Sequence, residues 1–574
     1  MSTKSGLNAL AGSRAQAASK TTAAISTGYV LRSRAVFSGL FAAFSAISSY
    51  HSDSAVRNAF CIIGALLVFA FVFHMTARYR LIDELNGFTE YRYKRTVYGA
   101  TLLSLCAFWY SYTPSMNLLI SGEESPVLKA ALSTIVTLVM ALCFFILWYF
   151  LLRRCLEQVL IFLRSLSLYE KFLLYGYPTV MAIASFLTLM KTSAFIYSVN
   201  DGEPVWDVIF NSDTSLMLIH GENVFTSSNA YQNDFRSLLF GVYATPFSMI
   251  VAPVTFIADN ILTGLHLPLD RPLIFGYFMT IGQAALFGLG ALLIYRLLAR
   301  EMNKIHAAMF GVLYLASYPT LLFTMTIEQY AFSLATLLLF VYAYVNRANP
   351  DYAFVVAGTT LTSSFAMLPL ALYRNKRSFK AYWIAAVKLV LGACFAIALF
   401  GQLYEFPKAF KLLPEYLQGY AMGEGLSTAD KLAQYFDNLS SLFVAPNVSF
   451  VNGGVQVGEY EPTYRMISLV IAILAVTAIV VVRRTRLVAV SAYWMIVSII
   501  LFGIVGWGTA EEGLLLYTSY FSWCYLILIA LLFARLFKKF PIAGSIVLTV
   551  AVTALLLYNA TQIIDYTHHL DRFR

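Results

Sequence analysis

Long runs of apolar residues, separated by short polar connections, dominate this chain. Runs of about 17 to 25 apolar residues can cross a hydrocarbon core of about 30 Å as α-helices. Their unbroken apolarity excludes a membrane β-barrel, whose strands would alternate apolar and polar residues. The pattern predicts an all-α polytopic membrane protein with about 13 transmembrane helices. We expect them at residues 35–50, 57–78, 96–117, 128–152, 171–196, 272–297, 305–326, 329–345, 381–402, 466–482, 487–506, 515–534 and 542–558.

Three further segments do not fit a simple crossing. Residues 156–172 mix charges into a helical period, which predicts a helix lying on the inner membrane surface. Residues 237–261 contain two prolines, and we expect a broken helix in the outer leaflet. Residues 351–377 would form a re-entrant pair of half-length helices hinged at residues 358–364, with a plain span as the alternative.

Lys and Arg residues cluster at alternate ends of the expected spans, and such clusters mark the cytoplasmic side. This rule places the N-terminus in the cytoplasm, and the 197–236 loop and the C-terminus outside. Residues 1–34 carry Lys and Arg without any acidic residue, as a basic cytoplasmic tail or a transit peptide would. The expected location is the plasma membrane.

The chain divides into five parts on this pattern. Residues 1–34 form a basic tail, and residues 35–165 form an N-terminal four-helix membrane region with its interfacial helix. Residues 166–402 form a core whose acidic external loop is 197–236. Residues 403–465 form an external subdomain, and residues 466–574 form C-terminal helices with a short external tail. No internal repeat of fixed period is visible, which argues against transporters built from inverted repeats.

Composition supports the membrane assignment and limits the partners. Hydrophobic residues make up 59% of the chain and charged residues 12%, with a mean hydropathy of +0.70, which excludes a soluble globular protein. The net charge of +10 lies in short clusters at helix ends, so it indicates topology and not nucleic-acid binding. Six cysteines without paired spacing give neither a disulfide framework nor a zinc site. No nucleotide-binding fingerprint occurs.

Acidic residues gather in the loop after the fifth expected span. At a boundary between water and lipid, partial desolvation raises the pKa of a carboxylate and makes it a stronger base. Asp213 is therefore a candidate general base, with an ordinary hydrated loop as the alternative. Glu328, Glu511 and Glu512 lie in short connections expected at the same outer level, where ionisable residues are usually functional. Glu328 could instead cap the helix that follows it.

The same loop offers a candidate for binding phosphate. Arg236 presents paired donors to phosphate oxygens, although an ion pair with Asp234 would explain it equally well. His220 could titrate near neutrality or pack as an ordinary surface residue. No metal-ligand cluster has convincing spacing, so no cofactor is indicated; a divalent cation shared by Asp213 and another outer acid stays open.

Three stretches resemble those of the C-type integral membrane glycosyltransferases, the GT-C superfamily. They are NSDTSLMLIHGENVF with NDFRSLLFGVYATPF, TMTIEQYAFSLATLLLF, and EEGLLLYTSYFSW, the last resembling a poorly characterised bacterial branch. The resemblance covers about residues 170–535. It implies an enzyme that moves a sugar from a polyprenyl-phosphate carrier to a glycan or lipid acceptor on the external face.

The resemblance also implies roles for single residues. By motif position, Asp213 would be the base and Glu328 a second catalytic residue. The substrate-binding residues would be Arg236, Asp234, His220, Glu511, Glu512 and Tyr517. One acid between Ser212 and Thr214 replaces the acidic pair of stricter members, which leaves metal use open.

Other functions remain as alternatives. A transporter or flippase for lipid-linked glycans would need polar residues along a path through the membrane, and the expected spans carry few. A ligase or polymerase would join whole glycans with the same lipid-phosphate chemistry, using residues 403–465 to bind the glycan. A non-catalytic membrane scaffold is the third alternative.

Overall fold

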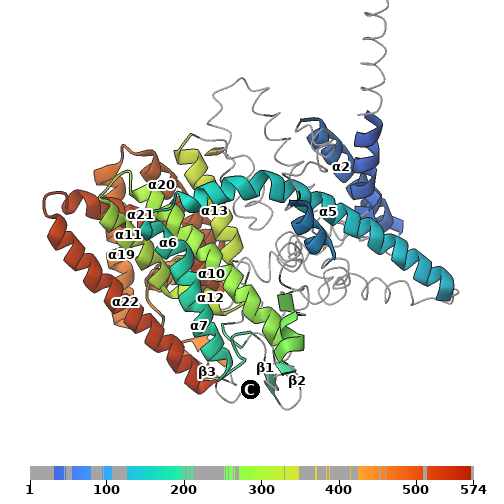
Figure 1. The fold of residues 1–574 in the computed structure, drawn as a ribbon. Coiled ribbons are helices and arrows are strands. Elements are labelled where there is room, and N and C mark those ends of the chain that lie inside the picture. Colours follow the sequence, from blue (N-terminus) through green and yellow to red (C-terminus); the bar gives the residue numbers. More distant parts are fainter. Residues whose placement is uncertain are drawn as a thin grey trace, which may run out of the picture. The chain divides into compact units, whose positions relative to one another are not determined.

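The described residues group into two mainly helical units, one within Met1–Ile161 and one within Phe162–Arg574. The computed structural model describes most of residues 31–46, 55–78, 94–105, 126–210, 251–264, 271–347, 425–507 and 513–570, with isolated positions between 367 and 414. Figure 1 shows most of these residues as helices joined by loops, and the strands form two short β-hairpins. The expectation of an all-α fold is confirmed at this level.

The N-terminal unit is built from apolar helices. They are residues 31–43, α2 (Ala55–Arg78), residues 96–105 and the first part of α5 (Pro126–Arg164). Arg34 ties the first of these to α2: its guanidinium donates to the carbonyl oxygen of Phe73 at 3.0 Å and lies 4.5 Å from the centre of the Phe73 ring. The contact pairs a charged group with a carbonyl and an aromatic face inside an apolar unit.

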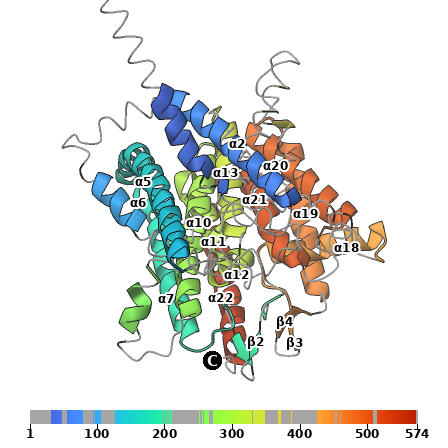
Figure 2. The same ribbon diagram turned by 90° about the vertical axis from the view of Figure 1, so that its right-hand side faces the viewer.

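The larger unit holds the remaining elements. They are α6 (Leu168–Lys171), η2 (Phe172–Gly176), α7 (Tyr177–Leu189), β1 (Ser198–Asn200), β2 (Glu203–Val205), α10 (Arg271–Leu298), α11 (Lys304–Ala316), α12 (Tyr318–Met325), α13 (Tyr330–Val345), α18 (Thr428–Asp437), η7 (Asn438–Leu442), β3 (Val448–Val451), β4 (Gly454–Val457), α19 (Pro462–Val482), α20 (Arg486–Ser498), η8 (Ile499–Val505), α21 (Gly513–Leu536) and α22 (Pro541–His569). Both hairpins are antiparallel, and Figure 2 shows β3 and β4 below α19.

Seven of the described helices are long and apolar enough to cross a membrane, or eight if the bent pair α11–α12 is one span. The chain is therefore a multi-pass membrane protein by length and composition of its helices. Helix α21 is the most buried of them: 89% of the residues in its apolar segment are buried inside the protein, compared with 11% for α22. The expected spans at 96–117 and 381–402, and the segments 237–261 and 351–377, lie wholly or partly outside the described residues.

The expected helix at 156–172 is not one continuous helix, and its place on the inner membrane surface stays a prediction. Helix α5 continues through Arg164, and a new helix starts at Leu168 as part of a candidate span that ends at Leu189. The boundary is local: the Ser167 hydroxyl accepts from the Glu170 amide, and the Glu170 carboxylate accepts from the Ser167 amide, which is a capping box. The sequence period continues across this break, so periodicity did not reveal it.

Glu170 also joins this helix start to α10. Its carboxylate accepts from Nε of Arg296 at 2.6 Å, and the Arg296 guanidinium lies 4.7 Å from the centre of the Phe162 ring. Nearby, a Cβ added to Gly288 would lie 2.6 Å from the carbonyl oxygen of Leu173. Because Gly288 has no side chain, the backbone of η2 can touch α10. The ion pair between Glu170 and Arg296 holds the start of α6 against α10.

The described part of 403–465 packs into the main core of the larger unit. Tyr435 on α18 is buried, and its hydroxyl shares hydrogen bonds of 2.9 Å with Ser498 and Tyr525. Burial raises the pKa of Tyr435, so the phenol stays neutral in this network. The hairpin is tied to the last helix by Phe450, whose ring stacks on His569 with centroids 4.0 Å apart. Helix α22 thus continues well past the expected end at residue 558.

Candidate functional site

The bent pair α11–α12 lies at the centre of the candidate site. We expected one straight span at 305–326, but the two helices meet at an angle of 54° at Ser317. Pro319, near the start of α12, has no amide proton and clashes with the carbonyl four residues earlier, so it favours a break here. A break inside a membrane helix leaves backbone groups that need partners from elsewhere in the protein.

Asn559 on α22 supplies those partners. It is fully buried, and its Nδ2 donates to the carbonyl oxygens of Ala316 at 2.8 Å and Phe443 at 2.7 Å. Its Oδ1 accepts from the amide of Ala445 at 2.8 Å. The carbonyl of Phe443 also accepts from the amide of Tyr318 at 3.0 Å. One amide side chain therefore joins the helix break to the segment after η7.

Asn559→Leu is expected to lower the free energy of unfolding by about 2–5 kcal/mol, because the Ala316 and Phe443 carbonyls and the Ala445 amide each lose a buried partner. Thermal unfolding in detergent measures this change. Thr561→Val is the matched control, since its exposed hydroxyl bonds only within the same helix. Equal melting temperatures for the two variants would contradict the assigned role of Asn559.

The far end of α12 is held by a second buried amide, Gln283 on α10. Its Nε2 donates to the carbonyl oxygens of Phe323 at 2.6 Å and Thr326 at 2.9 Å. Its Oε1 accepts from the backbone amide of Glu328 at 3.1 Å. Gln283 is 2% exposed, so all of these bonds form away from water. The turn from α12 to α13 is thus attached to α10 by one side chain.

Glu328 lies in this turn and is itself 2% exposed. Next to it, Ile327 packs against α10 at Gly276, where an added Cβ would lie 2.9 Å from Cδ1 of Ile327. The hydroxyl of Thr326 is buried without a hydrogen-bond partner among the described residues. An acidic side chain buried among membrane helices is usually functional, and it can exchange a proton or orient a polar ligand.

Tyr517 lies in a cluster of aromatic rings that includes Tyr330. Tyr330 follows Glu328 by two positions, and its ring centre lies 6.1 Å from that of Tyr517 and 5.1 Å from that of Tyr520, both on α21. Tyr517 also stacks on Phe502 of η8 at 5.6 Å. The structure therefore places Tyr517 against Tyr330, which follows Glu328 by two positions in the chain.

The segment that leads to Asp213 is attached near the start of α12. Val208 and Phe210 exchange backbone hydrogen bonds with Val455 of β4, at 2.8 and 2.9 Å. Phe210 has a φ of 51° and makes edge contacts with Tyr318 and Tyr566. Asp213 follows Phe210 by three positions. The start of the acidic loop is thus fixed against α12, α22 and the second hairpin.

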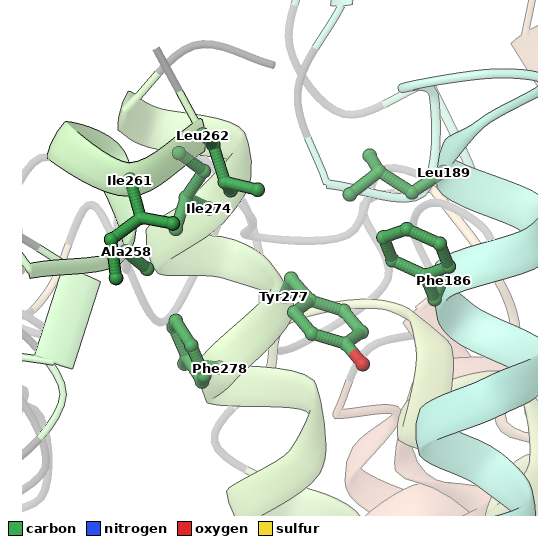
Figure 3. Close-up of a pocket in the computed structure, with 8 residues that line it drawn as sticks. All are labelled: Phe186, Leu189, Ala258, Ile261, Leu262, Ile274, Tyr277 and Phe278. Carbon is green, nitrogen blue, oxygen red and sulfur yellow. The ribbon is translucent and has the colours of Figure 1, made fainter. Parts of the chain in front are cut away.

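An apolar cavity of about 330 Å³ lies between α7, residues 258–262 and α10 (Figure 3). Its lining residues are Phe186, Leu189, Ala258, Ile261, Leu262, Ile274, Tyr277 and Phe278. Among these described residues Tyr277 has the one polar side chain, and its hydroxyl donates to the carbonyl of Ala182 at 3.2 Å. Helical spacing puts Ile274 and Phe278 on the face of α10 opposite Gln283. The cavity suits a hydrocarbon chain.

The remaining expected site residues lie outside the described part of the chain. They are Asp213, His220, Asp234, Arg236, Glu511 and Glu512. Sequence reasoning missed Gln283 and Asn559. For Gln283 the signal was an amide isolated in an apolar span, whereas Asn559 lies just past the expected end of the last span at residue 558. Within the described residues no group of three or more His, Cys, Asp or Glu could hold a metal ion. Compared with protein-family models, with curated proteins and with solved structures, the chain gives no match.

Proposed function

We propose that this protein is a membrane glycosyltransferase that moves a sugar from a polyprenyl-phosphate carrier to an acceptor on the external face. The observation that carries the proposal is Glu328, an acid that is 2% exposed in the turn after a broken helix. Burying an ionisable group among membrane helices costs free energy, and such groups usually serve a function. The backbone hydrogen bonds that residues 323, 326 and 328 make to Gln283 support a catalytic position over an incidental one.

The proposed reaction needs a base and a cation. Asp213 takes the proton of the acceptor hydroxyl, whose oxygen attacks the anomeric carbon of the sugar. The bond from that carbon to the phosphate oxygen breaks, and the carrier phosphate leaves with the bonding electrons. Arg236 stabilises the phosphate charge, and Glu328 orients the acceptor. Glu511, Glu512, Asp234, His220 and Tyr517 are proposed to complete the substrate-binding surface.

The apolar cavity supports a lipid-linked donor. Its volume of about 330 Å³ and its apolar lining fit part of an isoprenoid chain. Helix α10 has the cavity on one face and Gln283 on the other, so the lipid and the polar groups would lie on either side of one helix. This separation would keep hydrocarbon away from the groups that handle water and protons.

Incubation of the purified protein with a set of polyprenyl-phosphate sugars and candidate acceptors tests the proposal. The expected result is release of free polyprenyl phosphate together with a glycosylated acceptor, detected by mass spectrometry. Protein heated to denature it provides the background rate. Intact donors after incubation with every sugar and acceptor class would contradict the proposal.

A transporter or flippase for lipid-linked glycans is the second candidate. The bent pair α11–α12 favours it, because transporters use discontinuous helices around their binding sites. A buried polar contact between the hydroxyls of Tyr177 and Thr324, at 2.7 Å, lies beside this pair. Reconstituted vesicles separate the two candidates: a transporter moves the labelled lipid-linked glycan across the bilayer unchanged, whereas the transferase cleaves it.

A further inference from the structure

We infer that Gln283 is the positioning residue for Glu328, fixing the turn at residues 326–328 that presents the carboxylate. The inference deepens the proposed function and rests on it for its kinetic readout alone. Gln283 is not proposed to contact the substrate. It acts on Glu328 through the backbone of the turn. The structural part of the inference can be tested without any activity.

Three backbone groups of one short segment converge on the Gln283 side chain. Its amide nitrogen donates to carbonyls at Phe323 and Thr326, and its oxygen accepts from the amide of Glu328. The first carbonyl belongs to the last turn of α12 and the other two groups to the turn itself. A single side chain therefore sets how the chain leaves α12 and where Glu328 begins.

The rest of α12 is held by other contacts. At its start, the Tyr318 amide donates to Phe443, and the Tyr318 hydroxyl lies 3.1 Å from that of Tyr566. Near its C-terminal end, Thr324 shares a hydrogen bond with Tyr177. Loss of Gln283 should therefore free the turn that carries Glu328 and leave the helix in place. Because different contacts hold the helix and the turn, an effect of Gln283 on the position of Glu328 can be measured apart from an effect on the stability of the whole protein.

Gly276 shows why the turn needs a polar clamp as well as packing. Its missing side chain lets Ile327 and Ile196 approach α10 closely, because a Cβ added at this position would lie 2.9 and 2.1 Å from their side-chain carbons. This packing fixes the distance between α10 and the turn, but apolar contacts are non-directional. The directional bonds of Gln283 select the orientation of the Glu328 backbone.

Gln283→Leu tests the inference, because leucine has a side chain of similar size that is apolar and therefore removes all three bonds. Hydrogen exchange measured by mass spectrometry on peptides spanning residues 322–335 should show about tenfold faster exchange near Glu328. The matched control is Tyr177→Phe, which removes the hydrogen bond to Thr324 on the same helix. That control should leave exchange at the turn unchanged.

The kinetic arm measures sugar transfer by the same variants. Gln283→Leu should lower kcat about ten- to hundredfold with little change in KM, since a misplaced catalytic group weakens the transition state more than binding. Tyr177→Phe should keep kcat within about threefold of wild type. A purely structural role would instead lower the melting temperature of both variants and leave the kcat of the folded protein unchanged.

The outcomes separate this inference from the proposed function. Faster exchange confined to the turn, together with a lower kcat, supports the positioning role. Unchanged exchange at the turn overturns it, whether or not the protein transfers sugar. If wild type transfers no sugar but the turn still loosens in Gln283→Leu, the proposed function fails while the structural role of Gln283 stands.

Discussion

Glu328→Gln is expected to lower kcat for sugar transfer about a hundredfold while leaving the fold intact. Glutamine has the same shape as glutamate. The backbone N–H of residue 328 donates to Oε1 of Gln283, and the substitution keeps this bond. The change removes the ability of this buried group to ionise or to exchange a proton. Steady-state kinetics of carrier-phosphate release, with thermal unfolding alongside, measures both effects.

Glu301→Gln is the matched control for this prediction. Glu301 is an exposed acid three residues past the C-terminal end of α10, so its charge can be removed without changing the candidate site. We expect the control to retain wild-type kcat and melting temperature. Activity close to wild type in Glu328→Gln would remove Glu328 from the mechanism and leave its burial as a matter of packing.

Much of the helical framework follows from the sequence because hydrophobic length alone determines it. The expected span at 272–297 matches α10, Arg271–Leu298, and the expected span at 466–482 matches α19, Pro462–Val482. The helix starts are less predictable, since they depend on a few local bonds. The capping box at Ser167 divided one apparently continuous amphipathic stretch into the end of α5 and the start of α6.

The bend between α11 and α12 could not be predicted from local pattern alone. Pro319 weakens the helix locally, but a membrane helix can keep a proline if its neighbours satisfy the freed backbone groups. Here the neighbours are Asn559 and Phe443, both distant in the sequence. A single sequence shows each of these residues but not their convergence.

For the candidate site, too, the sequence shows the single residues but not which of them meet in the fold. The sequence identifies Glu328 as an acid between two apolar helices, which left a functional role and a helix-capping role equally open. Its backbone amide donates to Gln283, which is 45 positions away, and its neighbour Ile327 packs closely against Gly276. Tyr517 joins through the rings of Tyr330 and Tyr520. These contacts follow from helix packing and are not encoded in any short motif.

Asp213→Asn is expected to abolish sugar transfer while leaving expression and carrier binding near those of wild type. Asparagine keeps the size of the side chain but cannot accept the proton that the acceptor hydroxyl must lose. The expected loss is about a hundredfold or more in kcat, with little change in the affinity for polyprenyl phosphate. Release of carrier phosphate measures the first quantity, and equilibrium binding of labelled carrier measures the second.

Asp207→Asn provides the comparison, because Asp207 lies in the same acidic loop and no catalytic role is proposed for it. Phe210 lies between the two acids in the chain and is anchored to β4, α12 and α22, so a change at position 207 should not release the segment that leads to Asp213. Equal loss of transfer in both variants would point to loop charge as the cause. Loss in Asp213→Asn alone would make Asp213 the base, since the two variants remove the same charge and differ only in where they remove it.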